Sequence, residues 1–251
     1  MLPIRMGELT TEECAAALAS PHPTVLLPVG STEPHGPHLP LSTDALLSEE
    51  VCARAAAALR AGGVTALAAP ALPYGVTRYA REFAGAASLS PEATARVVEE
   101  LARSWRDMGF ACVCVVNNHL EPEHVAALAE GVARVPGAVF ANQLTRRWGR
   151  TLSAEFKRGD CHAGRYETSL VLASRPELVR DAVRAELAPV PISLSEAIRL
   201  GRKTFRAMGS ERGYFGAPAE GTVDEGEALY ARLVAMVTAE VREGLGLDAA
   251  P

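Results

Sequence analysis

Short apolar segments alternate along this 251-residue chain with longer segments that have helical periodicity. The apolar runs have the length of buried strands, and turn or capping residues separate them from the helical segments. Strands are expected at 24–29, 64–70, 110–116 and 138–143, and helices at about 11–19, 44–61, 91–109, 122–135, 164–174, 193–208 and 223–244. This alternation indicates βαβ units, so we expect a three-layer α/β/α sandwich with a mostly parallel central sheet.

The length suits one large α/β domain, and no linker, charge block or internal repeat divides the chain, so 1–251 is expected to form a single domain. A formal net charge of -5 gives no electrostatic footprint for nucleic acid. The chain shows no signal peptide and no apolar run long enough to span a bilayer. We therefore expect a cytoplasmic protein with neither a nucleic-acid nor a membrane partner.

The five cysteines are few, odd in number and scattered, which argues against a disulfide framework. Cys112 and Cys114 alternate on an expected strand and face the same way. They could ligate a metal, but small buried hydrophobic residues are the favoured interpretation. Cys161 stands beside His162 and is a less favoured candidate nucleophile, because the sequence offers no independent base for it.

The segment GSTEPHGPHLPLSTD, residues 30–44, follows the first expected strand and places Glu33, His35 and Asp44 close together in the chain. Two interleaved prolines exclude a helix and give stiff turns that hold side chains still. In a parallel α/β sheet, ligands gather at the carboxyl ends of the strands, where this segment lies. It is either a polar loop or half of a metal site.

A second polar segment, NNHLEPEH at residues 117–124, follows the strand expected at 110–116. Its His119 and Glu121 are two residues apart and can point the same way. Together the two segments supply three carboxylates and two imidazoles, a set that suits Zn²⁺, Mn²⁺ or a related divalent ion. With one bridging carboxylate, such a set holds two ions about 3.5 Å apart around a hydroxide nucleophile. Each residue alone fits a loop hydrogen-bonding role, but the combination favours a metal site.

The remaining histidines of these regions fit structural roles better. His22 lies between prolines in an early turn, His124 stands one turn into a helix, and His38 could support a ligand from outside. A third segment, GDCHAGRYETS at residues 159–169, enters a helix and contains His162 and Glu167. His162 is a candidate acid/base because a nearby helix N-terminus keeps imidazole neutral near pH 7, although a capping or core role fits equally well.

The three polar segments, in this order, resemble the signature segments of the creatininase (creatinine amidohydrolase) family. FAGAASLS at 83–90 and GYFGAPAEGT at 213–222 resemble two further segments of that family. The resemblance covers essentially the whole chain. It implies an α/β sandwich, a hexamer or other homo-oligomer, and two divalent ions per chain, Zn and/or Mn with Fe as a further option. It also implies hydrolysis of small non-peptide amides.

The resemblance also implies roles for single residues. Glu33 and His119 match ligands of one ion, and His35 and Glu121 match ligands of the other. Asp44 matches the carboxylate that bridges the two ions. His162 and Glu121 are implied to be catalytic, and Glu167 is expected to support the ligands from outside or to serve as a fallback ligand.

Two comparisons bear on the substrate. Leu120 and Glu121 stand where members resembling the formamide deformylases of flavin-type cofactor synthesis and the mycofactocin peptidase have Gly-Gly, which favours a creatininase-like amide. Creatininases, however, have tryptophans in the lid before the catalytic histidine, and this chain has EFKRGD there. Lys157 and Arg158 of that stretch are therefore expected to bind an anionic substrate.

The expected function is hydrolysis of a small cyclic or formyl amide, in which a metal-bridging hydroxide attacks the carbonyl and His162 moves the proton to the departing nitrogen. Two alternatives within the family remain, a formamide deformylase and a mycofactocin-type peptidase. A non-catalytic, metal-stabilised binding protein is the alternative from another class, and it would need no acid/base at His162. A nucleotide binder is disfavoured, because no GxGxxG or Walker pattern follows a strand.

Overall fold

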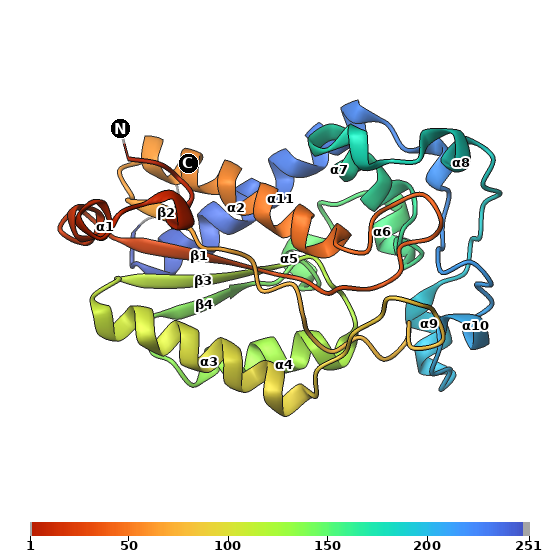
Figure 1. Cartoon of the computed structure of the whole chain (residues 1–251), viewed down its shortest axis with the longest axis horizontal. Coiled ribbons are helices and arrows are strands. Elements are labelled where there is room, and N and C mark those ends of the chain that lie inside the picture. The colour runs from red at the N-terminus through yellow and green to blue at the C-terminus, as the bar shows by residue number, and fades with distance from the viewer. Residues whose placement is uncertain (1, 248–251) are drawn as a thin grey trace.

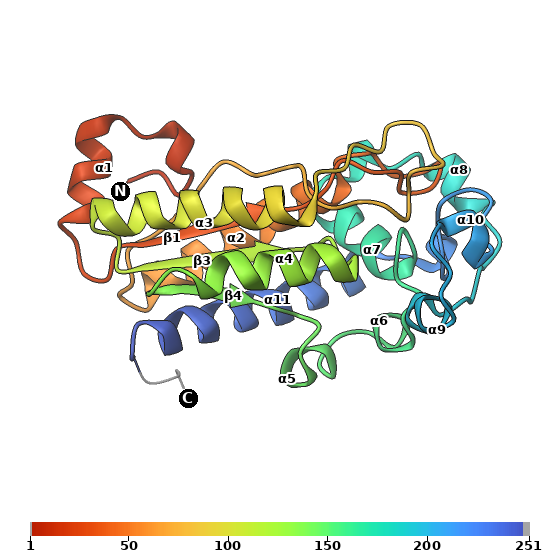
Figure 2. The same cartoon turned by 90° about the horizontal axis from the view of Figure 1, so that it is seen from below.

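The computed structural model describes residues 2–247 and contains a four-stranded parallel sheet. The strands are β1 (Thr24–Val29), β2 (Ala66–Ala68), β3 (Cys112–Asn117) and β4 (Ala138–Ala141), in the spatial order β2-β1-β3-β4. Helices lie on both faces of the sheet (Figures 1 and 2). The expected three-layer α/β/α sandwich with a parallel sheet is thus confirmed.

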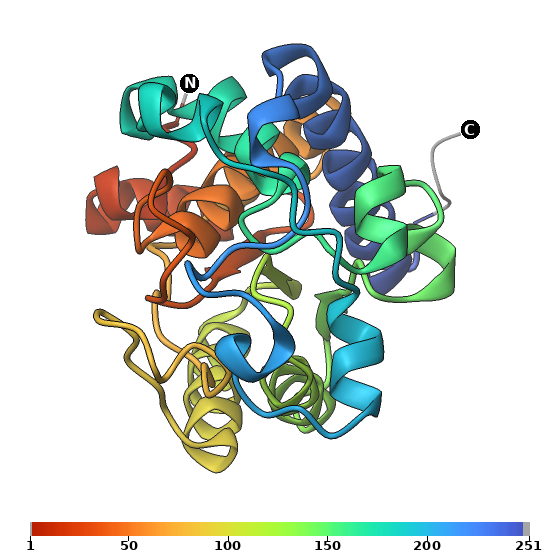
Figure 3. The same cartoon turned by 90° about the vertical axis from the view of Figure 1, so that its right-hand side faces the viewer.

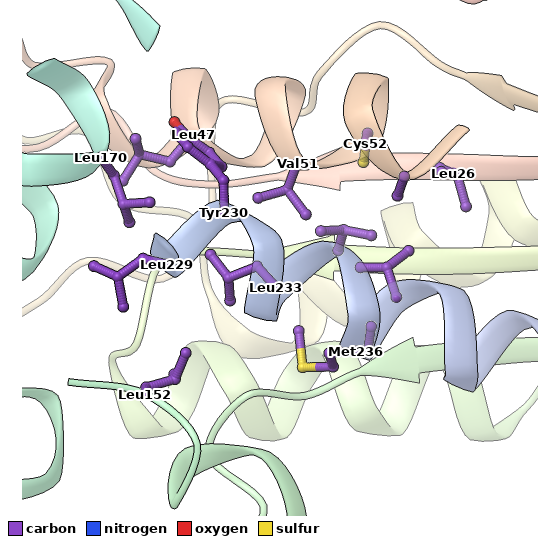
Figure 4. Close-up of a cluster of buried hydrophobic side chains, with 14 of the residues drawn as sticks. Leu26, Leu47, Val51, Cys52, Leu152, Leu170, Leu229, Tyr230, Leu233 and Met236 are labelled. Carbon is purple, nitrogen blue, oxygen red and sulfur yellow. The ribbon is translucent and has the colours of Figure 1, made fainter. Parts of the chain in front are cut away.

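Alternate residues of the strands face two separate apolar cores, because successive side chains of a strand point to opposite faces. Leu26 and Cys114 belong to the core under α2 (Thr43–Ala61) and α11 (Val223–Gly244), which Figure 4 shows in close-up. The other core lies under α1 (Thr11–Leu18), α3 (Pro91–Met108) and α4 (Pro122–Ala133) and contains Val25, Leu27 and Val113.

The starts of several helices follow the capping residues in the sequence. Thr10 and Glu13 form a capping box at the start of α1, with both reciprocal hydrogen bonds present. Ser90 accepts a hydrogen bond from Ala93 N at the start of α3, where Pro91 takes the first helical position. Thr222 caps α11 in the same way through Glu225 N.

One expected helix, 193–208, is wrong as a continuous element. The structure has two short helices there, α9 (Leu194–Arg199) and α10 (Phe205–Met208). Gly201 between them has φ +78°, a left-handed conformation that ends a helix, and Thr204 then caps the second helix through Ala207 N. Further short helices, α5 (Arg146–Gly149), α6 (Ala154–Arg158) and α8 (Asp181–Ala185), were not expected from the sequence.

The carboxyl ends of the strands face the end of the molecule where α9 and α10 lie, at the right of Figure 1 and towards the viewer in Figure 3. Here the long loop between β2 and α3, called the 70–90 loop, contacts the segment around α9 and α10. A third apolar cluster joins the two, with Ala80 from the loop packed among Phe205, Met208 and Phe215. This cluster forms a roof over the strand ends and therefore over the candidate site.

Among residues 2–247, no helix combines the length and the apolar character needed to cross a membrane.

Candidate metal centre

The loop after β1 brings Glu33 and His35 back towards the start of α2. Gly30 makes this return possible, because a Cβ at that position would lie 2.4 Å from Ala45 N. A hydrogen bond from Glu33 N to Leu41 O, 3.0 Å long, then closes the loop. Asp44 lies in the first turn of α2, so its carboxylate faces the same space as the two loop residues.

Glu33, Asp44 and His119 form one buried group of metal-ligating atoms. His119 follows the end of β3, and its Nδ1 lies 3.1 Å from Glu33 Oε1 and 3.1 Å from Asp44 Oδ2. The other ring nitrogen, Nε2, donates to Val76 O over 2.7 Å, which leaves Nδ1 to face the carboxylates.

His35, Asp44 and Glu167 form a second group on the other side of Asp44. His35 Nε2 lies 3.0 Å from Asp44 Oδ1 and 3.5 Å from Glu167 Oε2, while its Nδ1 donates to Glu33 O over 3.1 Å. Glu167 comes from the first turn of α7 (Arg165–Ser174), where Ala163 N donates to its carboxylate over 2.6 Å. Asp44 therefore belongs to both groups, one oxygen to each.

His162 lies against this cluster, between α6 and α7, and forms a third ligand-type group with Glu33 and His35. Its Nε2 donates to Pro34 O over 3.0 Å, and its Nδ1 lies 3.7 Å from Glu33 Oε1. The ring is held between two others, with centroids 4.6 Å from His35 and 4.5 Å from Phe205. Burial and the nearby charge of His35 lower the pKa of His162 to about 4, so its imidazole is neutral at pH 7.

Glu121 lies near the cluster but outside the three ligand-type groups found in residues 2–247. Its carboxylate accepts hydrogen bonds from Arg78 N at 2.9 Å and from Tyr79 N at 3.2 Å. Burial raises its pKa. The structure thus brings Glu167 among the candidate ligands and directs Glu121 towards the 70–90 loop.

The carboxylates of the cluster form ion pairs only with histidines, whose charge is lost when they are deprotonated. The ion pairs of Glu33, Asp44 and Glu167 all involve histidines. Burial raises the pKa of Glu167 to about 8, which reflects the cost of a third negative charge in this space. Asp44 Oδ2 is buried and, within residues 2–247, has no hydrogen-bond partner, because His119 Nδ1, although 3.1 Å away, does not meet hydrogen-bond geometry with it. A divalent cation would compensate both deficits, so the residues present fit metal ions.

The other residues singled out from the sequence lie as follows. His38 is buried and its Nε2 lies 3.0 Å from Thr168 Oγ1, next to Glu167 on α7. Lys157 and Arg158 are exposed, and Arg158 pairs with Asp160 over 3.3 Å. His22 is exposed, whereas Cys112 and Cys114 are buried in β3.

Sequence reasoning missed Glu155, a buried carboxylate of α6 that ties together the segments around His162. Its Oε1 accepts from Tyr166 N over 2.8 Å and its Oε2 from Ala217 N over 2.9 Å. A Cβ at residue 164 would lie 2.5 Å from Oε1, and one at residue 216 would lie 2.3 Å from Oε2. The paired glycines in HAGR and YFGAP were the available signal, although they do not identify their partner.

A pocket of about 280 Å³ opens onto the cluster. Glu33, Asp44, His119, Glu121, His162 and Glu167 line its polar end. The remaining wall is almost entirely apolar and comes partly from the third apolar cluster and partly from the segments after β3 and β4 and from α6. It consists of Tyr79, Leu120, Pro122, Leu144, Phe156, Leu194, Ile198 and Phe205, with Gly159, Cys161 and Ser195 between them. Lys157, Arg158 and the chain's two tryptophans, Trp105 and Trp148, are not part of this lining.

Fold and site define the class of the protein: a parallel α/β sandwich whose strand ends carry a buried cluster of carboxylates and imidazoles around an apolar pocket. Residues 7–241 match the family model described as creatininase, creatinine amidohydrolase. The chain therefore belongs to the creatininase family of hydrolases.

Two characterised relatives illustrate the range of this family. The chain is 34% identical over 240 residues to a mycofactocin precursor peptide peptidase of Mycobacterium tuberculosis (strain CDC 1551 / Oshkosh), a match that covers 91% of this chain and 88% of the relative. It is 29% identical over 196 residues to a creatinine amidohydrolase of Pseudomonas putida, which covers 69% and 73%.

Solved structures with this fold include creatininases. A manganese creatininase superposes with a TM-score of 0.75 at 24% identity, over 96% of this chain and 98% of the other. A creatinine amidohydrolase superposes with a TM-score of 0.76 at 23% identity, over 98% and 99%. At these identities the likeness supports the fold alone.

Proposed function

We propose that this protein is a metal-dependent amidohydrolase that cleaves the C–N bond of a small, uncharged amide. The observation that carries the proposal is the position of Asp44, whose two oxygens face different imidazoles in two groups of candidate ligands. His162, a neutral imidazole, lies within reach of the same cluster. A shared carboxylate beside a neutral base suits hydrolysis at a pair of metal ions.

The proposed ligands differ in one residue from those expected from the resemblance. Glu33, Asp44 and His119 would hold one ion, and His35, Asp44 and Glu167 would hold the other. Glu167 replaces Glu121 in this assignment because it lies beside His35, whereas Glu121 accepts two main-chain hydrogen bonds instead. The imidazoles of this set suit Zn²⁺, and its carboxylates suit both Zn²⁺ and Mn²⁺.

When bound, such ions supply Lewis-acid chemistry: they acidify water and polarise an amide carbonyl. His162 carries the proton. Its Nε2–H is engaged by Pro34 O, so Nδ1 is the atom that takes a proton from the attacking water and returns it to the departing nitrogen. The rings of His35 and Phe205 hold the imidazole plane in place during both transfers.

The apolar wall of the pocket supports an uncharged substrate. A charged group placed against Leu144, Phe156 and Ile198 would lose its hydration without gaining a partner. Lys157 and Arg158 are exposed and outside the lining, so they are not placed to compensate such a charge. The proposed substrate is therefore a neutral amide with an apolar group on one side of the C–N bond.

A short peptide is the second candidate substrate. It is favoured by the 34% identity to proteins named as mycofactocin precursor peptide peptidases, which act on a peptide. The apolar wall would accept an apolar side chain next to the scissile bond as readily as an apolar amide. The two candidate substrates undergo the same C–N hydrolysis. They differ in size, because a peptide would have to extend out of the pocket through its mouth.

The test is an assay of the purified protein, reconstituted with Zn²⁺ or with Mn²⁺, against creatinine, neutral cyclic amides, formamides and short apolar peptides. Mass spectrometry of the products identifies the bond that is cleaved. His162→Ala should bind the ions as the wild type does and lose turnover by on the order of 10²-fold or more. Wild-type turnover in His162→Ala would refute the proton-transfer role of His162, whereas no turnover of any panel substrate by the metal-loaded wild type would favour the non-catalytic binding protein.

A further inference from the structure

His124 plays no part in the proposed chemistry, yet it lies directly behind a candidate ligand. It belongs to the first turn of α4 and its side chain is fully buried. Its ring centroid lies 4.7 Å from that of His119, with the rings inclined by 61°. A buried polar ring in such a place calls for a full account of its hydrogen bonds.

Both nitrogens of His124 have a partner, and the partners fix its tautomer. Val76 N is 3.2 Å from His124 Nδ1, and because a main-chain N–H only donates, Nδ1 must accept. The proton is therefore on Nε2, which donates to Asn117 Oδ1 over 3.1 Å.

These bonds belong to a closed ring of hydrogen bonds that contains His119. The carbonyl of Val76 accepts from His119 Nε2 over 2.7 Å, so the two sides of one residue's main chain contact the two imidazoles. Asn117 completes the ring, because its Oδ1 also accepts from His119 N over 3.1 Å and its Nδ2 donates to His119 O over 2.5 Å. His124 thus supports His119 through both Val76 and Asn117.

The loop that carries Val76 leaves space for the imidazole ring of His124. A Cβ at residue 75 would lie 2.2 Å from His124 Nδ1 and Cε1, so only glycine allows this approach. On the other side of Val76, the hydroxyl of Thr77 donates to Glu33 Oε2. Residues 76 and 77 therefore contact two of the three side chains in the group of Glu33, Asp44 and His119.

We propose that His124 is a positioning residue for that group alone, an inference that rests on the proposed metal dependence. It holds the Val76 carbonyl where His119 Nε2–H can donate to it, which aims Nδ1 at the ion. Such outer contacts change metal affinity by roughly 10- to 100-fold. His35 and Glu167 of the other group make no hydrogen bond to Val76, Asn117 or His124 within residues 2–247, and the shared Asp44 meets this set only at His119, so the ion of that group should be unaffected.

The test compares metal binding by the wild type and by two variants. His124→Phe keeps a ring and removes both hydrogen bonds, whereas His124→Asn keeps an acceptor near the place of Nδ1. Stepwise titration of the metal-free proteins with Zn²⁺ against a chromophoric chelator gives two dissociation constants. Visible spectra of the Co²⁺-loaded proteins report the ligand geometry at each step. His22→Asn, an exposed histidine changed elsewhere, is the control.

We expect His124→Phe to weaken one of the two ions by about 10- to 100-fold and to leave the other at its wild-type affinity. His124→Asn should recover part of the loss, and it also serves if the phenylalanine variant does not fold. Unchanged binding of both ions in the variants, or equal loss of both, would refute the role of His124. A wild type that binds no ion would instead refute the proposed function, and this inference with it.

Discussion

Asp44 reaches His35 with one carboxylate oxygen, at 3.0 Å between Oδ1 and Nε2, and keeps its second oxygen for the opposite half of the cluster. The pair joins the start of α2 to the loop that precedes it. A carboxylate in this position serves both proposed ions. Its removal should therefore affect the binding of both, whereas removal of a ligand to one ion should affect only that ion.

The first prediction is that Asp44→Ala loses both ions. Elemental analysis after reconstitution and gel filtration should give close to two ions per chain for the wild type and close to none for the variant. Asp224→Ala is the matched control, because it removes an exposed carboxylate from the first turn of another helix, α11. Full occupancy in Asp44→Ala would contradict a bridging role.

The second prediction separates Glu167 from Glu121. Glu167→Gln should reduce the content from two ions to one, because the carboxylate beside His35 is lost. Glu121→Gln should retain both ions, since the geometry gives its carboxylate to Arg78 N and Tyr79 N. The reverse pattern, with an ion lost from Glu121→Gln only, would restore the assignment that the resemblance implies.

This difference shows what the sequence could and could not supply. Glu33, His35, Asp44 and His119 were predictable as neighbours, because the carboxyl ends of adjacent parallel strands meet at one edge of a sheet. Glu121 follows the same strand end, but the direction of its side chain depends on amides of a loop 43 residues away in the chain. Hydrogen bonds of that kind have no sequence pattern.

The fold divides in a similar way. Strands and long helices have periodic apolar residues and capping residues, so their places follow from local chemistry. The break between α9 and α10 depends on a single glycine, Gly201, inside a segment that otherwise has helical spacing. The pocket wall and the role of Glu155 depend on how loops distant in the chain pack, which only the folded structure contains.

The third prediction concerns the metal-free protein, whose stability should fall as pH rises from 6.5 to 8. The charges of Asp44 and Glu167 outweigh the burial of His35 and raise its pKa to about 10, and burial raises the pKa of Glu167 to about 8. Both values exceed those of the unfolded chain, so the folded state binds more protons in this range and loses stability as they leave. The lowered pKa of His162 acts in the opposite sense only below pH 6.5.

Thermal unfolding in EDTA at several pH values measures this effect. The Tm should decrease between pH 6.5 and 8, and Glu167→Gln should flatten the dependence because it removes one of the titrating groups. Saturating Zn²⁺ should also reduce the slope, since a bound cation takes the place of the protons. A Tm that rises through this range in EDTA would show that the cluster is not protonated as the geometry indicates.

The last prediction concerns the substrate, for which sequence and structure point in different directions. Lys157 and Arg158 suggested an anion, whereas the pocket wall favours a neutral, apolar group. With a substrate found in the amide panel, the double substitution Lys157→Gln, Arg158→Gln should leave KM and kcat close to those of the wild type.

Leu144→Asp should raise KM by roughly 10-fold with little change in kcat, because a charge in the wall weakens binding of an apolar group without touching the reacting atoms. Leu144 is 45% exposed, so its replacement should leave the fold intact. A higher KM in the double variant together with normal kinetics of Leu144→Asp would mean that the substrate is anionic and approaches along α6 rather than along the apolar wall.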